Sequence, residues 1–173
     1  MSDKYAAERG SPSAKQCSTY NILFDGYYLK LHSGTRMLQA WHARSGKKSA
    51  AGKYDYSIAN QKVANSGPIP VGDYWIQPIQ LHSMLLGSDG WGNYRITIHP
   101  YPGTVTHARG GFFIHGGKQF GSAGCIDLAH GIDSLAPILR DMAPPTGTWP
   151  FRTDNECHVP VVVKYGSLTV SDP

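Results

Sequence analysis

The stretch that decides the fold and the chemistry of this chain is residues 112–127, which read Phe-Phe-Ile-His-Gly-Gly-Lys-Gln-Phe-Gly-Ser-Ala-Gly-Cys-Ile-Asp. An apolar run ends in His115, and a glycine-rich turn then leads to Cys125. A free thiol has a pKa of about 8.5, so a nucleophilic cysteine needs a nearby base or cation to form its thiolate. His115 is far enough before Cys125 for the chain to turn and bring the two side chains together. The stretch therefore predicts a thiolate active site.

The turn that precedes Cys125 contains only small residues, from Gly121 to Gly124. It leaves backbone N–H groups free, and those of Gly124 and Cys125 are expected to bind the oxyanion of a tetrahedral intermediate. Taken alone, the cysteine and the histidine are each more typical of structural positions. Their combination on one turn favours catalysis. Because a glycine follows His115, a backbone carbonyl is expected to orient the imidazole.

Length and composition indicate a single β-rich domain. The chain has 173 residues, 40% hydrophobic and 16% charged, with 20 Gly and 12 Pro, which favours many turns and few long helices. The net charge of +4 favours an anionic partner, such as a cell-wall glycopeptide. No arginine-rich helix or base-stacking motif is present, so no nucleic acid is expected. Residues 1–17 are polar and small and predict a flexible leader, followed by one domain over residues 18–173.

Three cysteines leave one unpaired whichever pair forms. If Cys125 is the nucleophile, Cys17 and Cys157 are the only pair that can form a disulfide, which would tie the two ends of the domain together. No Cys or His pair has the short spacing of zinc sites, so neither a metal nor another cofactor is expected. No stretch is long and apolar enough to insert into a membrane, and residues 1–16 lack a signal core, so we expect synthesis in the cytoplasm.

The hydrophobic pattern predicts strands at residues 20–24, 27–32, 37–43, 71–79, 94–99 and 111–115. Asp25-Gly26 predicts a two-residue hairpin turn. Residues 44–68 are expected to be a loop with a short helical or irregular piece near residues 56–60, and residues 80–92 are expected to be a second loop with Trp91 at its tip. Two runs at 159–165 and 167–170 predict a closing hairpin. The one expected helix, residues 131–142, contains Pro137 and carries an apolar stripe for the core: Ile132, Leu135, Ala136 and Leu139.

Three landmarks stand in order: Gly-Pro-Ile-Pro-Val-Gly-Asp-Tyr at 67–74, Ile-His-Gly at 114–116 and Ser-Ala-Gly-Cys-Ile at 122–126. Together they resemble the L,D-transpeptidase catalytic domain family over about residues 20–142, above all its compact subgroup of type VI secretion effectors. The resemblance implies a mainly β fold, a sandwich of two mixed sheets with one helix after the cysteine. It also implies a substrate, the peptidoglycan stem peptide, cut between meso-diaminopimelate and the terminal D-alanine.

Carried over by position, the resemblance makes Cys125 the nucleophile, His115 the general base and acid, and Gly124 with Cys125 the oxyanion hole. Ser122 matches the hydroxyl of the motif and is expected at the substrate. The reaction implied is L,D-carboxypeptidase cleavage, L,D-transpeptidase cross-linking or exchange of D-amino acids. The compact subgroup further implies a toxin that a secretion-system carrier delivers to the periplasm of a rival bacterium, and a cognate immunity protein in the producing cell.

Two positions depart from the family pattern. Ala123 stands where the larger family commonly has His, and Asp127 stands where it often has Arg or Asn. A carboxylate at position 127 would repel the carboxylate of a substrate, so another cation has to bind it. Arg109 and Lys118, which flank the strand and the turn, are the candidates, with ordinary surface charge as the alternative.

Two other classes of protein fit parts of the pattern. A papain-like or amidase-type cysteine peptidase places its nucleophile at the start of a helix with His downstream, where His130 and His158 are available. A non-catalytic peptidoglycan-binding module would use aromatic faces, which four Trp and ten Tyr could supply. In this chain His115 precedes Cys125, and this order counts against a papain-like or amidase-type peptidase.

Overall fold

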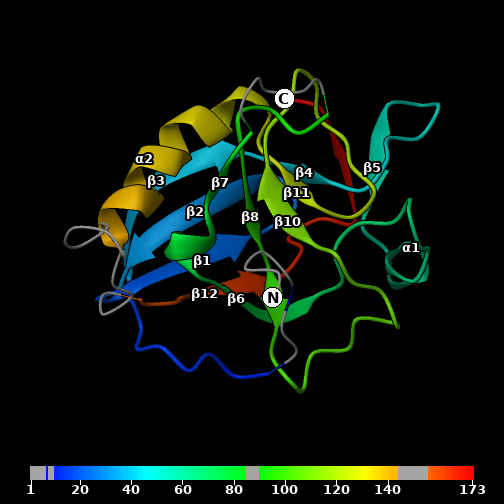
Figure 1. Ribbon diagram of the computed structural model, residues 1–173. Helices are drawn as coiled ribbons and strands as arrows, with labels where there is room; N and C mark the ends of the chain where they lie inside the picture. The colour runs from blue at the N-terminus through cyan, green and yellow to red at the C-terminus, as the bar shows by residue number, and fades with distance from the viewer. Residues whose placement is uncertain (1–6, 8–9, 85–89, 144–155) are drawn as a thin grey trace.

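The computed structural model describes residues 7, 10–84, 90–143 and 156–173, and most of its regular structure is β (Figure 1). Two mixed sheets and one small pair of strands are present. The first sheet contains, in spatial order, β3 (Arg36–His42), β2 (Tyr28–Ser33), β1 (Tyr20–Phe24), β12 (Val159–Val163), β6 (Gly72–Ile76) and β9 (His99–Pro100). The second contains β4 (Arg44–Ser45), β11 (Ile126–Asp127), β10 (Phe113–His115), β8 (Tyr94–Thr97) and β7 (His82–Ser83).

Each sheet has one parallel pair of strands, β1 with β12 and β10 with β11, and is otherwise antiparallel. Successive side chains of a strand point to opposite faces. The face that each sheet turns inward carries buried apolar side chains, and the two inward faces share one buried core. The expected mainly β fold with two mixed sheets is confirmed. Examples of the shared core are Ile22, Leu31, Val161, Ile96, Ile114 and Ile126.

The expected helix is confirmed as α2 (Ile132–Met142), and it continues through Pro137. All four residues of the predicted apolar stripe are buried. Its outer side is tied to β3, beside which it runs in Figure 1, because the indole Nε1 of Trp41 donates a hydrogen bond to Ser134 Oγ. The helix therefore follows the cysteine closely and covers one side of the sandwich. No helix among the described residues combines the length and apolar character needed to cross a bilayer.

Four local expectations need correction. Phe24 pairs with Leu29, so the first hairpin turn is longer than two residues, and the Asp25 carboxylate accepts hydrogen bonds from the backbone N–H groups of Tyr27 and Tyr28. The expected loop at 44–68 contains β4 and β5 (Lys53–Asp55), while the short helical piece expected near residues 56–60 is present as α1 (Ile58–Gln61). The expected loop at 80–92 contains β7. The strand expected at 94–99 is divided between the two sheets as β8 and β9.

The prediction of a closing hairpin at residues 159–170 is wrong. β12 lies between β1 and β6, whereas β13 (Thr169–Ser171) pairs with β5. The runs at 159–165 and 167–170 both have the apolar character of strands, but the pairing partner of a strand depends on the rest of the fold. The antiparallel hairpin therefore gives way to pairing with distant segments.

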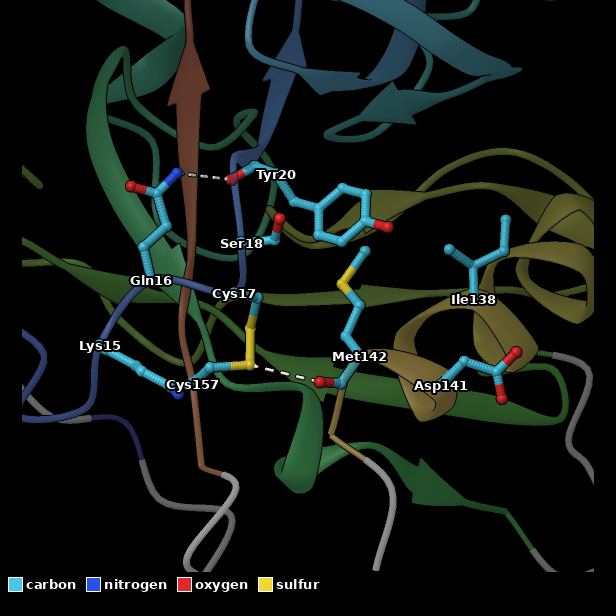
Figure 2. Close-up of a pocket in the computed structure, with 9 residues that line it drawn as sticks. All are labelled: Lys15, Gln16, Cys17, Ser18, Tyr20, Ile138, Asp141, Met142 and Cys157. Atoms are coloured by element: carbon cyan, nitrogen blue, oxygen red, sulfur yellow. Dashed lines mark hydrogen bonds between the residues drawn. A yellow bond between two sulfur atoms is a disulfide. The ribbon is translucent and has the colours of Figure 1, made fainter.

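The disulfide between Cys17 and Cys157 is present. It lies beside the end of α2, where Cys157 Sγ is 3.6 Å from the backbone oxygen of Met142 (Figure 2). The pocket drawn there, about 480 Å³, is lined by residues around the disulfide and by neither Cys125 nor His115. The bridge joins the segment before β1 to the segment before β12, two adjacent parallel strands.

The described part of the expected leader contacts the first sheet. Trp75 Nε1 donates to the backbone oxygen of Gly10, and His158 Nδ1 donates to that of Ala14. The backbone N–H of Cys17 donates to the oxygen of His158. Residues 1–6 and 8–9 of this leader lie outside the described residues, and the boundary at residue 18 stays a prediction.

Replacing both Cys17 and Cys157 by Ser should lower the free energy of unfolding by about 2–5 kcal/mol, because the bridge closes a long loop in the unfolded chain. Urea unfolding followed by tryptophan fluorescence measures the change. Cys125→Ser serves as the matched control, since it removes a sulfur atom without opening the loop. Equal midpoints for the double variant and this control would contradict the expectation.

Candidate active site

The candidate site is built on the parallel pair β10 and β11. Ile114 lies opposite Ile126 and His115 opposite Asp127, so the same register places Cys125 beside Phe113. Because side chains alternate along a strand, Cys125, Phe113 and His115 occupy one face, and the two isoleucines occupy the face that packs in the core. The structure thus brings the predicted cysteine and histidine to the same face of the second sheet.

His115 is held with a defined tautomer. Its ring is 3% exposed, and Nδ1 lies 2.6 Å from the backbone oxygen of Gly116. A carbonyl oxygen can only accept a hydrogen bond, so Nδ1 carries the proton and Nε2 of the neutral ring keeps its lone pair. Burial lowers the pKa of His115, and the hydrogen bond to Gly116 raises it by less. The expected carbonyl that orients the imidazole is confirmed as that of Gly116.

Gly116 also permits the close packing of this strand end against α2. A Cβ at this position would lie 2.3 Å from Ile132 Cγ2 and 2.6 Å from the backbone oxygen of Ala129. Any larger residue would push the strand away from the first turn of the helix. The glycine after His115 therefore fixes both the imidazole and its distance from the helix.

Cys125 is the free cysteine and is 8% exposed. Its Sγ lies 3.9 Å from the backbone oxygen of Gly111. Burial raises the pKa of the thiol to about 11, while the guanidinium groups of Arg95 and Arg109 act in the opposite direction with smaller effect. The resting pair is therefore a neutral thiol and a neutral imidazole. The expected role of His115 as the general base that removes the thiol proton during attack stays a prediction.

Ser122 and Gly124 shape the turn. The Ser122 hydroxyl donates to the backbone oxygen of Cys125 at 2.7 Å and accepts from the N–H groups of Gly46 and Gly124 at 3.2 and 3.3 Å. Gly124 has a φ of 130°, and a Cβ there would lie 2.5 Å from Arg109 Nη2. Glycine is required at 124 on both counts. The Ser122 hydroxyl is engaged by the turn itself, so its expected contact with substrate stays a prediction.

Arg109 holds the turn to a neighbouring loop. Its Nη1 donates to the backbone oxygens of Gln61 and Pro68, both at 2.6 Å, and its Nη2 donates to those of Gly67 and Ala123 at 2.8 and 3.4 Å. Carbonyl groups thus occupy the nitrogen atoms that would bind a substrate carboxylate. Lys118 is exposed in the connection between β10 and β11. Substrate binding by either cation stays a prediction, and the contacts of Arg109 favour a structural role.

Asp127 does not stand where a substrate carboxylate would meet it. The side chain is buried, and it accepts hydrogen bonds from the backbone N–H groups of Gly121 at 3.1 Å and Ala129 at 2.7 Å. Burial raises the pKa of Asp127 to about 7, and the two backbone hydrogen bonds oppose the shift. Its position therefore ties the cysteine turn to the start of the helical segment.

A row of polar residues crosses the second sheet at one level. In-register pairs across all five strands place these side chains on the face that carries Cys125, and the row reads Arg44, Asp127, His115, Arg95 and His82. Arg95 was missed from the sequence. The alternation of Arg95 with Ile96 in the sequence indicated that Arg95 lies on the face opposite the core. The sequence did not indicate that this strand pairs with β10. Trp91, expected at a loop tip, has its ring centroid 4.9 Å from that of His115.

Comparison with known proteins identifies one family. A family model described as the Tlde1 domain matches residues 39–140. No curated protein matches the chain at a significant level. Among solved structures, an L,D-transpeptidase from Xylanimonas cellulosilytica has 16% identity and a TM-score of 0.44, with 90% of this chain and 64% of that chain covered. L,D-transpeptidase 1 of Mycobacterium tuberculosis has 14% identity and a TM-score of 0.40, with 84% and 62% covered. The chain thus spans less than two thirds of either structure.

Alkylation of Cys125 by iodoacetamide should become faster with every step from about pH 6 to about pH 9 without reaching a plateau, because the reaction needs the thiolate and burial raises the pKa of this thiol. Mass spectrometry of the unreduced protein reports on Cys125, since the other two cysteines are bridged. The same protein in urea supplies the control, with an ordinary thiol. A folded-state midpoint below that of the urea sample would contradict the neutral resting pair.

Proposed function

This chain belongs to the Tlde1 domain family, and we propose that it is a cysteine-dependent enzyme that modifies the tetrapeptide stems of peptidoglycan. The reaction is L,D-carboxypeptidase cleavage, L,D-transpeptidase cross-linking or D-amino-acid exchange. The observation that carries the proposal is the placement of Cys125 and His115 on one sheet face, with Nδ1 of the imidazole bound to a carbonyl and Nε2 left as the base.

Acyl transfer proceeds in two halves. As Cys125 Sγ attacks the carbonyl carbon of meso-diaminopimelate, His115 Nε2 takes the thiol proton. The oxyanion is bound by the N–H groups of Cys125 and Gly124, and the Gly124 N–H gives up its 3.3 Å hydrogen bond to Ser122 Oγ as the oxyanion forms. The C–N bond then breaks, the imidazolium gives its proton to the amine of the leaving D-alanine, and a thioester remains. Water resolves the thioester to a tripeptide stem, or an incoming amine resolves it to an exchanged or cross-linked product.

A neutral resting pair suits this order of events. Burial disfavours both the thiolate and the imidazolium before substrate arrives. Charge then develops only as the carbonyl carbon is attacked, where the oxyanion and the imidazolium offset one another. Arg109, Ser122 and Asp127 act in this scheme by fixing the backbone of the turn, because their polar atoms bind backbone groups on either side of Cys125.

The papain-like alternative fits the geometry poorly. Cys125 precedes a short strand, β11, and not a helix. His158 lies before β12 of the first sheet, where its ring Nδ1 donates to the backbone oxygen of Ala14. His158 therefore does not replace His115 in the proposed mechanism, and His130 is exposed in the short 3₁₀ helix at Ala129–Gly131.

Family membership supports the biological setting of the proposal. The enzyme is a toxin that a type VI secretion carrier delivers to the periplasm of a rival bacterium, where its peptidoglycan substrate lies. A cognate immunity protein protects the producing cell. The net charge of +4 favours binding to an anionic cell-wall polymer.

Incubation of purified tetrapeptide muropeptides with the protein should remove D-alanine, or exchange it for an added D-amino acid. Cys125→Ala should abolish the reaction, and His115→Ala should slow it by about 10²–10⁴-fold because the general base is lost. Mass spectrometry of the products measures both effects, with Lys164→Ala, at an exposed position directly after β12 of the first sheet, as a folded surface control. Unchanged muropeptides with the wild-type protein would sink the proposed chemistry.

Expression with a periplasmic signal should stop the growth of a Gram-negative host, and expression without it should not, because the substrate lies outside the cytoplasm. Colony counts after induction measure the effect. Cys125→Ala sent to the periplasm at equal abundance is the control and should be harmless. Equal toxicity of this variant would point to damage that does not depend on the thiol.

A further inference from the structure

Arg95 is a cation on the face of the second sheet that carries the candidate site. It lies opposite His115 in the antiparallel pair of β8 and β10, so the two side chains share a face of the sheet. Within the part of the chain that the structure describes, its Nε is buried and has no hydrogen-bond partner. Among the described residues, moreover, Arg95 forms no ion pair. Buried donors without a partner are uncommon and need a reason.

Two aromatic rings hold the Arg95 guanidinium in place. Its Cζ lies 5.1 Å from the ring centroid of Trp91 and 5.0 Å from that of Phe113, within the range of cation–π contacts. The Trp91 ring also contacts His115, so one indole touches both the base and the cation. A guanidinium stacked in this way is oriented before any ligand arrives. Such a planar fork suits bidentate binding of a carboxylate.

The other cations near the turn are occupied or enclosed. Arg109 donates to four backbone carbonyls. Arg44 is 0% exposed and donates to the backbone oxygens of Ser171, Tyr27 and Ala43. Arg95 is only partly buried, and it is close enough to lower the pKa of the Cys125 thiol. It is therefore the cation best placed to meet an anionic substrate group beside the reacting atoms.

The order of Cys125, His115 and Arg95 across the sheet matches the order of the reacting groups in the substrate peptide. Cys125 precedes β11, His115 belongs to the next strand, β10, and Arg95 to the strand after that, β8. In a peptide that ends in D-alanine, the attacked carbonyl carbon is followed by the leaving nitrogen and then by the terminal carboxylate. With the carbonyl at the thiol and the nitrogen at the imidazole, the carboxylate falls on the Arg95 side. Directly opposed residues have Cβ atoms about 5 Å apart, a spacing that suits adjacent groups of one amino acid.

We propose that Arg95 binds the terminal carboxylate of the leaving D-amino acid, and of the incoming D-amino acid in exchange, and so restricts the enzyme to chain-terminal bonds. The assignment rests on the proposed function for the identity of the substrate. It replaces Arg109 and Lys118, the cations expected from the sequence. The Asp127 side chain, which stands where the larger family often has Arg or Asn, is turned to backbone groups, so it does not compete for Arg95.

Binding to the inactive Cys125→Ala protein tests the proposal without turnover. The probes are a synthetic tetrapeptide stem ending in D-alanine and the same peptide ending in D-alaninamide, titrated by calorimetry. The free carboxylate should bind about 10–100-fold more tightly than the amide, because a charge-assisted pair is lost. Adding Arg95→Gln should reduce affinity for the acid to that for the amide, and Arg95→Lys should give an intermediate value.

Arg140→Gln is the matched control. Arg140 also stacks on an aromatic ring, with Cζ 5.6 Å from the centroid of Tyr94, but it belongs to α2. The Arg140→Gln substitution should leave the preference for the acid over the amide unchanged. Circular dichroism of each variant checks that it is folded. If the Arg95 variants do not fold, the ratio of the affinities of the Cys125→Ala protein for the acid and the amide still tests the proposal.

The outcomes separate this assignment from the proposed function. Equal binding of acid and amide by the Cys125→Ala protein, or an unchanged preference in Arg95→Gln, overturns the role of Arg95 even if the wild-type protein cleaves the stem. No binding of either peptide also overturns it. Arg95-dependent binding of the acid without cleavage by the wild-type protein supports the carboxylate site and rejects the reaction.

Discussion

The parallel pairing of β10 with β11 makes the chain leave one strand at His115 and return to the beginning of its neighbour just after Cys125. Parallel strands usually need a connection of about a dozen residues or more, often a helix. Here both strands are very short, so residues 116–125 suffice. Small residues make so short a connection feasible. The position of the thiol relative to the imidazole follows from this pairing and from the alternation of side chains.

Hydrogen bonds between backbone groups and buried or partly buried polar side chains then stiffen the connection. Arg109 joins it to residues 61–68, Ser122 joins it to Gly46, and Asp127 joins its middle to the residues before α2. Each of these side chains satisfies backbone groups that a tight, buried turn would otherwise leave unpaired. The polar residues around Cys125 therefore fix the geometry of the turn that carries its thiol, and in the proposed mechanism they need not touch the substrate.

The same sheet face also sets the electrostatics. Core packing fills one side of the second sheet with isoleucine, so titratable residues collect on the other side in register across five strands. Burial keeps the cysteine and histidine neutral, whereas aromatic rings hold Arg95 beside them. A neutral reacting pair next to a fixed cation is suited to an anionic substrate whose charge lies beyond the bond that breaks.

The sequence by itself determined the β-rich class, the helix with its buried stripe, the single pair of cysteines available for a bridge, and the prediction of His115 and Cys125 as partners. These follow from local periodicity, glycine-rich turn chemistry and the number of cysteines. Only the tertiary structure decided that β12 pairs with β1, that Arg109 binds carbonyl groups and that Arg95 faces the imidazole. The physical reason is that strand partners and buried hydrogen-bond acceptors come from segments far apart in the chain. Alternation along one strand indicates which side chains share a face, but it does not indicate which strands lie beside it.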